Sequence, residues 1–72
     1  MTPPPDLSAR IPTTFAPELS SLASTLDDVV HRVTTLAEQA GASHLDEVSI
    51  ELFRIERNLI SAARRLDKLA RD

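Results

Sequence analysis

The sequence predicts an all-α protein, an antiparallel hairpin of two coiled-coil-like helices that dimerises into a four-helix bundle. Apolar residues recur at alternating spacings of three and four in two long runs, the heptad pattern of helices that pack along their length. A short segment with the chain's only glycine separates the runs, and so brief a connection makes them antiparallel neighbours. The apolar residues are almost all Leu, Ala, Ile and Val, a composition typical of helices packed on helices.

The segment before the first helix differs from the rest of the chain in composition. Residues 1–13 hold four of the five prolines, three of them consecutive, and proline favours extended backbone over helix. We expect this segment to be a disordered, Pro-rich arm that is free to reach a partner.

The first helix is expected at about residues 15–40. Thr13 or Thr14 can cap its N-terminus, and Pro17 suits a first turn, where its missing N–H is not needed. The apolar positions then follow without a slip: Phe15, Leu19, Leu22, Leu26, Val29, Val33, Leu36 and Ala40.

The turn is expected at residues 41–43 and the second helix at about residues 44–71. Gly41 can take the left-handed conformation that ends a helix, and Ser43 can cap the next one. The second heptad series is Leu45, Val48, Leu52, Ile55, Leu59, Ala62, Leu66 and Leu69. Folding the chain at Gly41 sets the two series against each other, from Leu36 with Val48 at the turn to Phe15 with Leu69 at the open end. These layers are the expected core.

A second apolar group has no partner in that arrangement. Ile50, Phe53 and Ile60 fall outside the heptad series of the second helix, and Val30 belongs to a flanking column on the first. A lone hairpin of this size buries too little surface to offset the ordering of its chain. We therefore expect these four residues to form a partner interface, most simply between two copies related by two-fold symmetry. A different protein could occupy the same face.

Little in the sequence indicates catalysis. There is no Cys, and the two histidines, His31 and His44, lie far from enough other ligands to hold a metal. No glycine-rich phosphate loop or nucleophile elbow is present. We expect a protein without enzymatic activity and without a cofactor.

Basic residues are concentrated at the end of the second helix. Arg57, Arg64, Arg65 and Lys68 are candidate contacts to a charged partner. Nucleic acid is not the expected partner, because the net charge is −3 and no aromatic stacking surface or recognition-helix pattern accompanies these cations.

The chain ends give no sign of export or membrane insertion. The start, MTPPPDLSARIP, lacks the basic residues and apolar run of a signal peptide, and no window approaches the roughly 18 apolar residues of a membrane span. A cytoplasmic protein that does not enter the membrane is expected.

The general plan of two long antiparallel helices in a small chain is similar to that of the small helical-hairpin proteins of actinobacterial type VII secretion. The turn here, QAGAS, has no Trp-x-Gly, and the end of the second helix, RRLDKLARD, has no Tyr-x-x-x-Asp/Glu. The similarity is therefore one of fold plan and implies no function.

The functional expectation is a protein–protein interaction module that self-associates or docks on a partner. One alternative is an accessory subunit that binds an enzyme or transcription factor one-to-one. Another is a nucleic-acid-associated protein that uses the basic end of the second helix.

Overall fold

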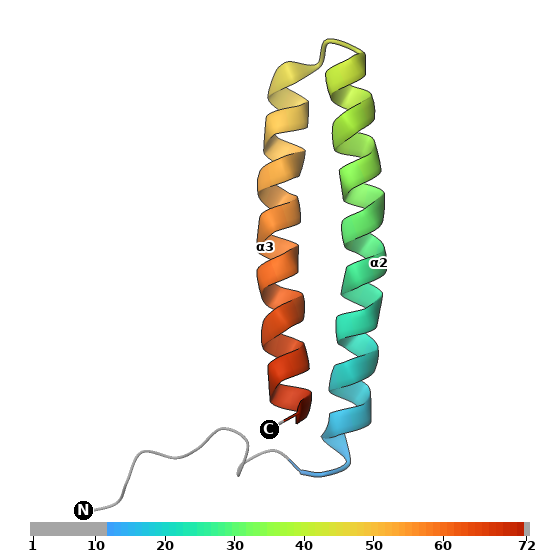
Figure 1. The fold of residues 1–72 in the computed structure, drawn as a ribbon, viewed down its shortest axis with the longest axis vertical. Coiled ribbons are helices and arrows are strands. Elements are labelled where there is room, and N and C mark those ends of the chain that lie inside the picture. Colours follow the sequence, from blue (N-terminus) through green and yellow to red (C-terminus); the bar gives the residue numbers. More distant parts are fainter. Residues whose placement is uncertain (1–11, 72) are drawn as a thin grey trace, which may run out of the picture.

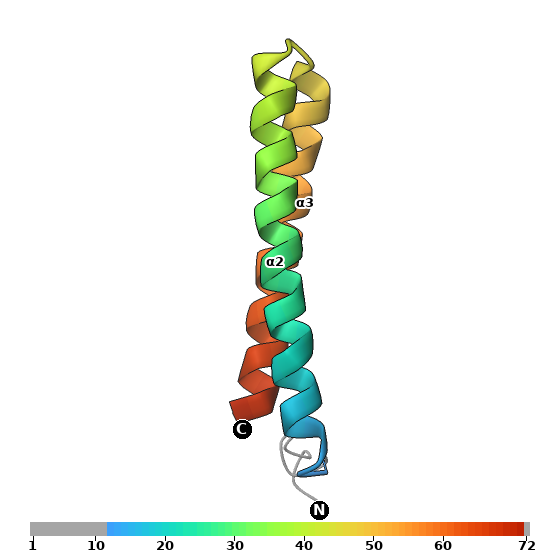
Figure 2. The ribbon, with the colours of Figure 1, turned by 90° about the vertical axis from the view of Figure 1, so that its right-hand side faces the viewer.

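The protein is a two-helix hairpin. The computed structural model describes residues 12–71, in which α2 spans Phe15–Ala42 and α3 spans Asp46–Arg71, and this part of the chain contains no strand. The helices lie antiparallel, with the turn at one end and the start of α2 beside the end of α3 at the other (Figure 1). Seen from the side, they form one layer and cross at a small angle (Figure 2). Most of the predicted arm, residues 1–11, is outside the described residues.

α2 begins directly after Thr14, the expected cap, but a different contact satisfies the N–H groups of its first turn. Thr14 has helical backbone angles and its side chain makes no capping hydrogen bond. Instead, the Phe15 and Ala16 N–H groups donate to the Pro12 and Thr13 carbonyls, at 2.9 and 3.4 Å. Two of the otherwise unpartnered N–H groups of the first turn are thereby satisfied by the preceding backbone.

The turn differs from the expected one because a residue other than Gly41 has the left-handed backbone conformation. Gly41 is inside α2 and has no positive φ, whereas His44 has φ 63°. The Leu45 N–H donates to the Ala40 carbonyl at 2.8 Å and the His44 N–H to the Gly41 carbonyl at 3.2 Å. These two bonds form a Schellman motif, which places the left-handed residue three positions after Gly41. The second helix therefore starts at Asp46, two residues later than expected, and Ser43 ends α2 instead of capping α3.

The residues buried between the helices are small. Within residues 12–71 the buried side chains are all alanines: Ala23, Ala37, Ala40 and Ala63. Three of them belong to two columns of residues, one on each helix, whose members are spaced seven residues apart and lie where the helices face each other. We call these two columns the small-residue seam. Its members are Ala16, Ala23, Val30 and Ala37 on α2 and Ser49, Glu56, Ala63 and Ala70 on α3.

Gly41 lies beside this seam near the turn. A Cβ atom on Gly41 would lie 3.3 Å from the Ser49 Oγ, so the glycine serves close approach of the helices. The Ser49 hydroxyl in turn donates across the seam to the Ala37 carbonyl at 2.8 Å. Small side chains thus bring one helix within hydrogen-bonding distance of the other's backbone.

A second polar contact crosses the seam at mid-length. The half-buried Thr34 hydroxyl of α2 lies within hydrogen-bonding distance of the Glu56 carboxylate of α3 and of its own helix carbonyl at Val30, 2.9 Å away. It has one proton, so it donates to one acceptor at a time. With the Ser49 contact, it ties the two helices at two heights and defines their register.

The expected core layers are only partly formed. Leu19, Leu26 and Val33 of α2 and Leu52, Leu59 and Leu66 of α3 are half-buried beside the seam. Leu22, Leu36 and Val48, which were expected inside, are 45–54% exposed. The reason is steric: the helices come closest where the side chains are smallest, and this turns the larger side chains to one side.

Replacing His44 by Gly should stabilise the hairpin. A side chain in the left-handed region costs about 1 kcal/mol or more, and glycine avoids that cost at this position. Thermal unfolding followed by circular dichroism should show a midpoint higher by about 4–8 °C per kcal/mol for a domain of this size. Because Cβ causes the strain, His44→Ala should give no such rise; an unchanged midpoint for His44→Gly would contradict the assigned turn.

Enlarging the seam should destabilise the fold. Ala37 is 0% exposed, so Ala37→Leu would push the helices apart and cost about 1–3 kcal/mol. The same Ala-to-Leu change at the exposed Ala42 is the matched control. At one protein concentration, the thermal midpoint should fall for Ala37→Leu alone, and equal midpoints for both variants would argue against close packing at Ala37.

Candidate interaction surface

A continuous apolar surface runs along one side of the hairpin. We call it the apolar face, and it combines the larger members of the two heptad series. These are Phe15, Leu19, Leu22, Leu26, Val29, Val33 and Leu36 on α2, and Leu45, Val48, Leu52, Ile55, Leu59, Ala62, Leu66 and Leu69 on α3. Six of them, Phe15, Leu22, Leu36, Leu45, Val48 and Ile55, are 39–54% exposed, and the others are half-buried.

Both helices contribute to this face because they are antiparallel. Ala37 and Ala63 on the seam each follow an apolar-face position, Leu36 and Ala62, by one residue, which is about 100° around a helix. The same rotation on two antiparallel helices turns both heptad series to the same side. Consistent with this, residues of both helices line one shallow depression near the turn: Leu36, Gln39, Ala40, Ser43, Leu45, Val48 and Leu52.

The heptad positions of the face are all apolar. From Phe15 to Leu36 and from Leu45 to Leu69 none of them carries a polar or charged side chain, although Gln39 and Ser43 also line the depression near the turn. Scattered apolar side chains are normal on soluble proteins, but a contiguous strip along two helices is typical of a surface that packs against something else.

The four residues predicted as a partner interface do not share one surface. Val30 and Ile60 are half-buried, with Val30 between Ala23 and Ala37 in the seam column. Ile50 is 53% exposed and Phe53 is 37% exposed. These two line a separate depression on α3 with Arg54 and Arg57. Their role in binding a partner stays a prediction.

From the sequence, the residues of the apolar face were expected to form the core of the hairpin. The signal that could have revealed it is the column next to each heptad series. On α2 this column is Ala16, Ala23, Val30 and Ala37, and on α3 it is Ser49, Glu56, Ala63 and Ala70, small except at Glu56. Small residues repeated every seven positions favour close helix approach, so they compete with the leucines for the contact.

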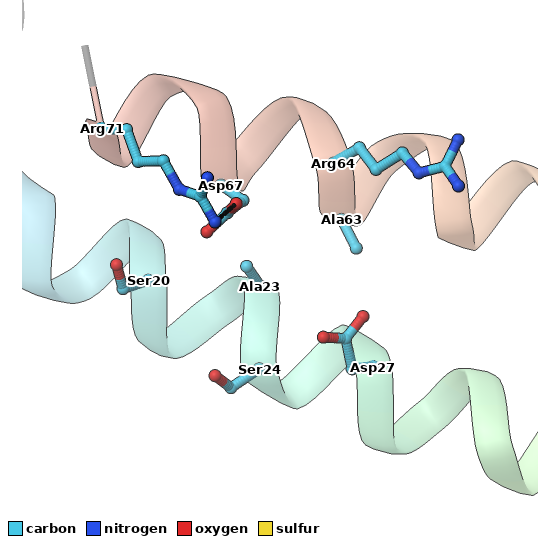
Figure 3. A pocket seen from close by; sticks show the side chains of 8 residues that line it. All are labelled: Ser20, Ala23, Ser24, Asp27, Ala63, Arg64, Asp67 and Arg71. Atoms are coloured by element: carbon cyan, nitrogen blue, oxygen red, sulfur yellow. Dashed lines mark ion pairs between the residues drawn. The ribbon is translucent and has the colours of Figure 1, made fainter.

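The opposite side of the hairpin is polar. A groove near the open end is lined by small and charged residues of both helices: Ser20, Ala23, Ser24, Asp27, Ala63, Arg64, Asp67 and Arg71. Ala23 and Ala63 point toward each other across the gap, while Asp67 and Arg71 form an ion pair of 2.8 Å (Figure 3). The hairpin is thus two-sided, with apolar residues on one side and polar residues on the other.

The predicted charged contacts divide into two groups. Arg57, Arg64 and Lys68 are exposed and lie in helical register with one another, at spacings of seven and four. Arg65 is also exposed, but it follows Arg64 by one residue and so points about 100° away. The structure therefore aligns three of the four cations and separates the fourth.

No arrangement typical of a metal centre is present in residues 12–71, where no three His, Cys, Asp or Glu side chains come together. His31 and His44 are both exposed. Neither α2 nor α3 has a stretch that is both apolar enough and long enough to span a bilayer.

Comparison with known proteins gives no family. No family model matches the chain, and neither a curated protein nor a solved structure matches it. The two-sided hairpin itself is therefore the basis for a functional conclusion.

Proposed function

We propose that this protein is a protein–protein interaction module that self-associates through its apolar face, two hairpins packing face to face as a four-helix bundle. The observation that carries the proposal is the exposure of Leu22, Leu36 and Val48 in an uninterrupted apolar strip shared by two helices. Such a strip is stable in water only when another apolar surface covers it.

The packing within one hairpin supports the need for a partner. Its buried residues are alanines, and within residues 12–71 no large side chain is fully buried. Alanine burial removes little apolar area from water, and isolated helices gain most of their stability from packing of an amphipathic face. A second layer would bury the leucines that one hairpin leaves half in solvent.

The size of the face fits a stable pairing of two copies. α2 has 28 residues and is therefore about 42 Å long, and two adjacent helices are about 20 Å wide. The product, about 800 Å² per copy, is the usual contribution of each partner to a specific interface.

The charges at the edges of the face support a second copy as the occupant. Beside the face, α2 carries Glu18 and then Arg32, while α3 carries Glu51 and then Arg65. Both helices therefore have their acid nearer the N-terminus and their base nearer the C-terminus. When helices of two copies meet antiparallel across the interface, each acid approaches a base, whereas parallel pairing would bring like charges together.

A two-fold axis parallel to the helices satisfies this condition. It places α2 of one copy over α3 of the other, antiparallel, and overlaps the faces along their whole length. Every adjacent pair of helices in the bundle is then antiparallel, and the remaining polar side of each hairpin faces solvent.

The test is the mass of the full chain in solution together with a matched pair of variants. Sedimentation at micromolar concentration should give the mass of two chains. Leu36→Asp places a charge on the apolar face and should shift the chain toward monomer and lower its thermal midpoint. Ile50→Asp is the control, because Ile50 is 53% exposed against 54% for Leu36 but lies off the face.

Dilution adds an independent measurement. The thermal midpoint of a dimer depends on protein concentration, so that of the native chain should fall on dilution. A well-folded monomer at all concentrations would overturn self-association. A chain that becomes helical only when mixed with a different protein would overturn it in favour of a one-to-one accessory subunit.

A further inference from the structure

A stripe of cations occupies the side of α3 that faces away from the apolar face. We call it the basic stripe: Arg54, Arg57, Arg64, Lys68 and Arg71. All five side chains are exposed. Arg57, Arg64 and Lys68, at spacings of seven and four, lie on one line along the helix, and Arg54 and Arg71 flank the two ends of that line on opposite sides, each about 60° round the helix from its neighbour. From Arg54 to Arg71 the stripe is about 25 Å long.

The central cations of the stripe are not neutralised within the hairpin. Arg54 pairs with Glu51 at 3.5 Å and Arg71 with Asp67 at 2.8 Å. Across residues 12–71, Arg57, Arg64 and Lys68 have no ion pair within 4.0 Å. Ile60 and Ser61 lie between Arg57 and Arg64 on this side of the helix and carry no charge, so the positive charge of the middle of α3 is directed to solvent.

The stripe continues into an apolar patch towards the turn. Ile50 and Phe53 line one depression together with Arg54 and Arg57, so apolar and cationic side chains share a single surface. Ile50 occupies the same helical line as the cations, one turn before Arg54. A ligand that lies along this line would contact apolar side chains at the end near the turn and cations along the rest of its length.

We infer that this surface binds an acidic amphipathic helix of a partner protein, with apolar residues at one end that cover Ile50 and Phe53. Carboxylates spaced every three or four residues along such a helix can reach the cations, and Arg–carboxylate contacts are among the stronger hydrogen-bonded pairs. The site goes beyond self-association, because the basic stripe and the apolar face lie on different sides of α3. A bundle of two hairpins would offer the stripe twice.

Two features favour a protein segment over nucleic acid. Phosphates would leave Ile50 and Phe53 without an apolar partner, and Phe53 is the one aromatic side chain at this surface, too few for a series of stacked bases. The polar side of α2, next to the stripe, carries Asp27, which lines one groove with Arg64 and would repel a broad polyanion. A single acidic helix is narrow enough to follow α3 alone.

The experiment uses the full chain and a synthetic helical peptide of about 18 residues, the length that matches the stripe. The peptide has Leu at one end and Glu at spacings of three and four, and a control peptide has Gln in place of each Glu. Fluorescence anisotropy at low salt should show binding of the Glu peptide, weaker binding of the Gln peptide, and loss of binding as salt rises. A labelled DNA duplex serves as the nucleic-acid probe.

Charge reversal at neighbouring positions distinguishes an effect of the stripe on peptide binding from an effect of the net charge. Arg64→Glu should weaken binding of the Glu peptide about tenfold or more, the effect of losing one charge-assisted contact. Arg65→Glu makes the same change in total charge one residue away, about 100° round the helix from Arg64, and should alter binding less than about threefold. Both residues are exposed, so helix content should stay unchanged in both variants. Chain mass should stay unchanged for Arg64→Glu, because Arg64 lies away from the apolar face.

Three results would overturn the inference. They are equal weakening by Arg64→Glu and Arg65→Glu, equal binding of the Glu and Gln peptides, and tighter binding of the duplex than of the Glu peptide. None of these depends on whether the chain is a dimer, so failure of this site would leave self-association through Leu36 untouched.

Discussion

Ala37 of α2 and Ala63 of α3 are both buried on the line where the two helices come closest, and Gly41 meets Ser49 on the same side near the turn. The orientation of the other side chains depends on this contact. Small side chains allow the backbones to approach, and a close approach gains many dispersion contacts that larger side chains would prevent. It also lets the Ser49 hydroxyl reach the Ala37 carbonyl, 2.8 Å away on the other helix. The seam thus fixes both the distance between the helices and their register.

The seam also explains why a hairpin with so many leucines has so small a core. With alanines at the contact, Leu22 and Leu36 are turned to one side of the layer, where each keeps about half of its surface in solvent. Neither helix can bury its leucines without giving up the close contact. The hairpin therefore leaves much of its apolar surface in solvent. Its apolar side and its polar side are suited to different partners. The proposed second copy covers the first side, and the basic stripe lies on the other.

Much of the architecture followed from the residues alone. The spacing of apolar residues predicted an all-helical hairpin with its break after Ala40, and the described helices agree within two residues at each end. The turn was predicted at residues 41–43 and lies at 43–45, and the predicted left-handed residue was also wrong. Glycine tolerates that conformation most easily, so Gly41 was the natural choice, yet the Schellman bonds place it at His44. Backbone hydrogen bonds at the end of the helix can therefore impose the left-handed conformation on a residue that does not prefer it.

The candidate surface could be predicted only in part. Ile50 and Phe53 were singled out as apolar residues without a partner inside the chain, and the structure leaves both at the surface. Their role in binding a partner stays a prediction. Val30 was grouped with them although it lies in the seam. Leu22, Leu36 and Leu45 were placed in the core although about half of their surface is open. By itself the sequence determined that two amphipathic helices fold back on each other, because periodicity and a short break are local properties. Only the tertiary structure decided how far each helix turns about its axis, because that rotation balances leucine burial against the close approach of alanines on the facing helix.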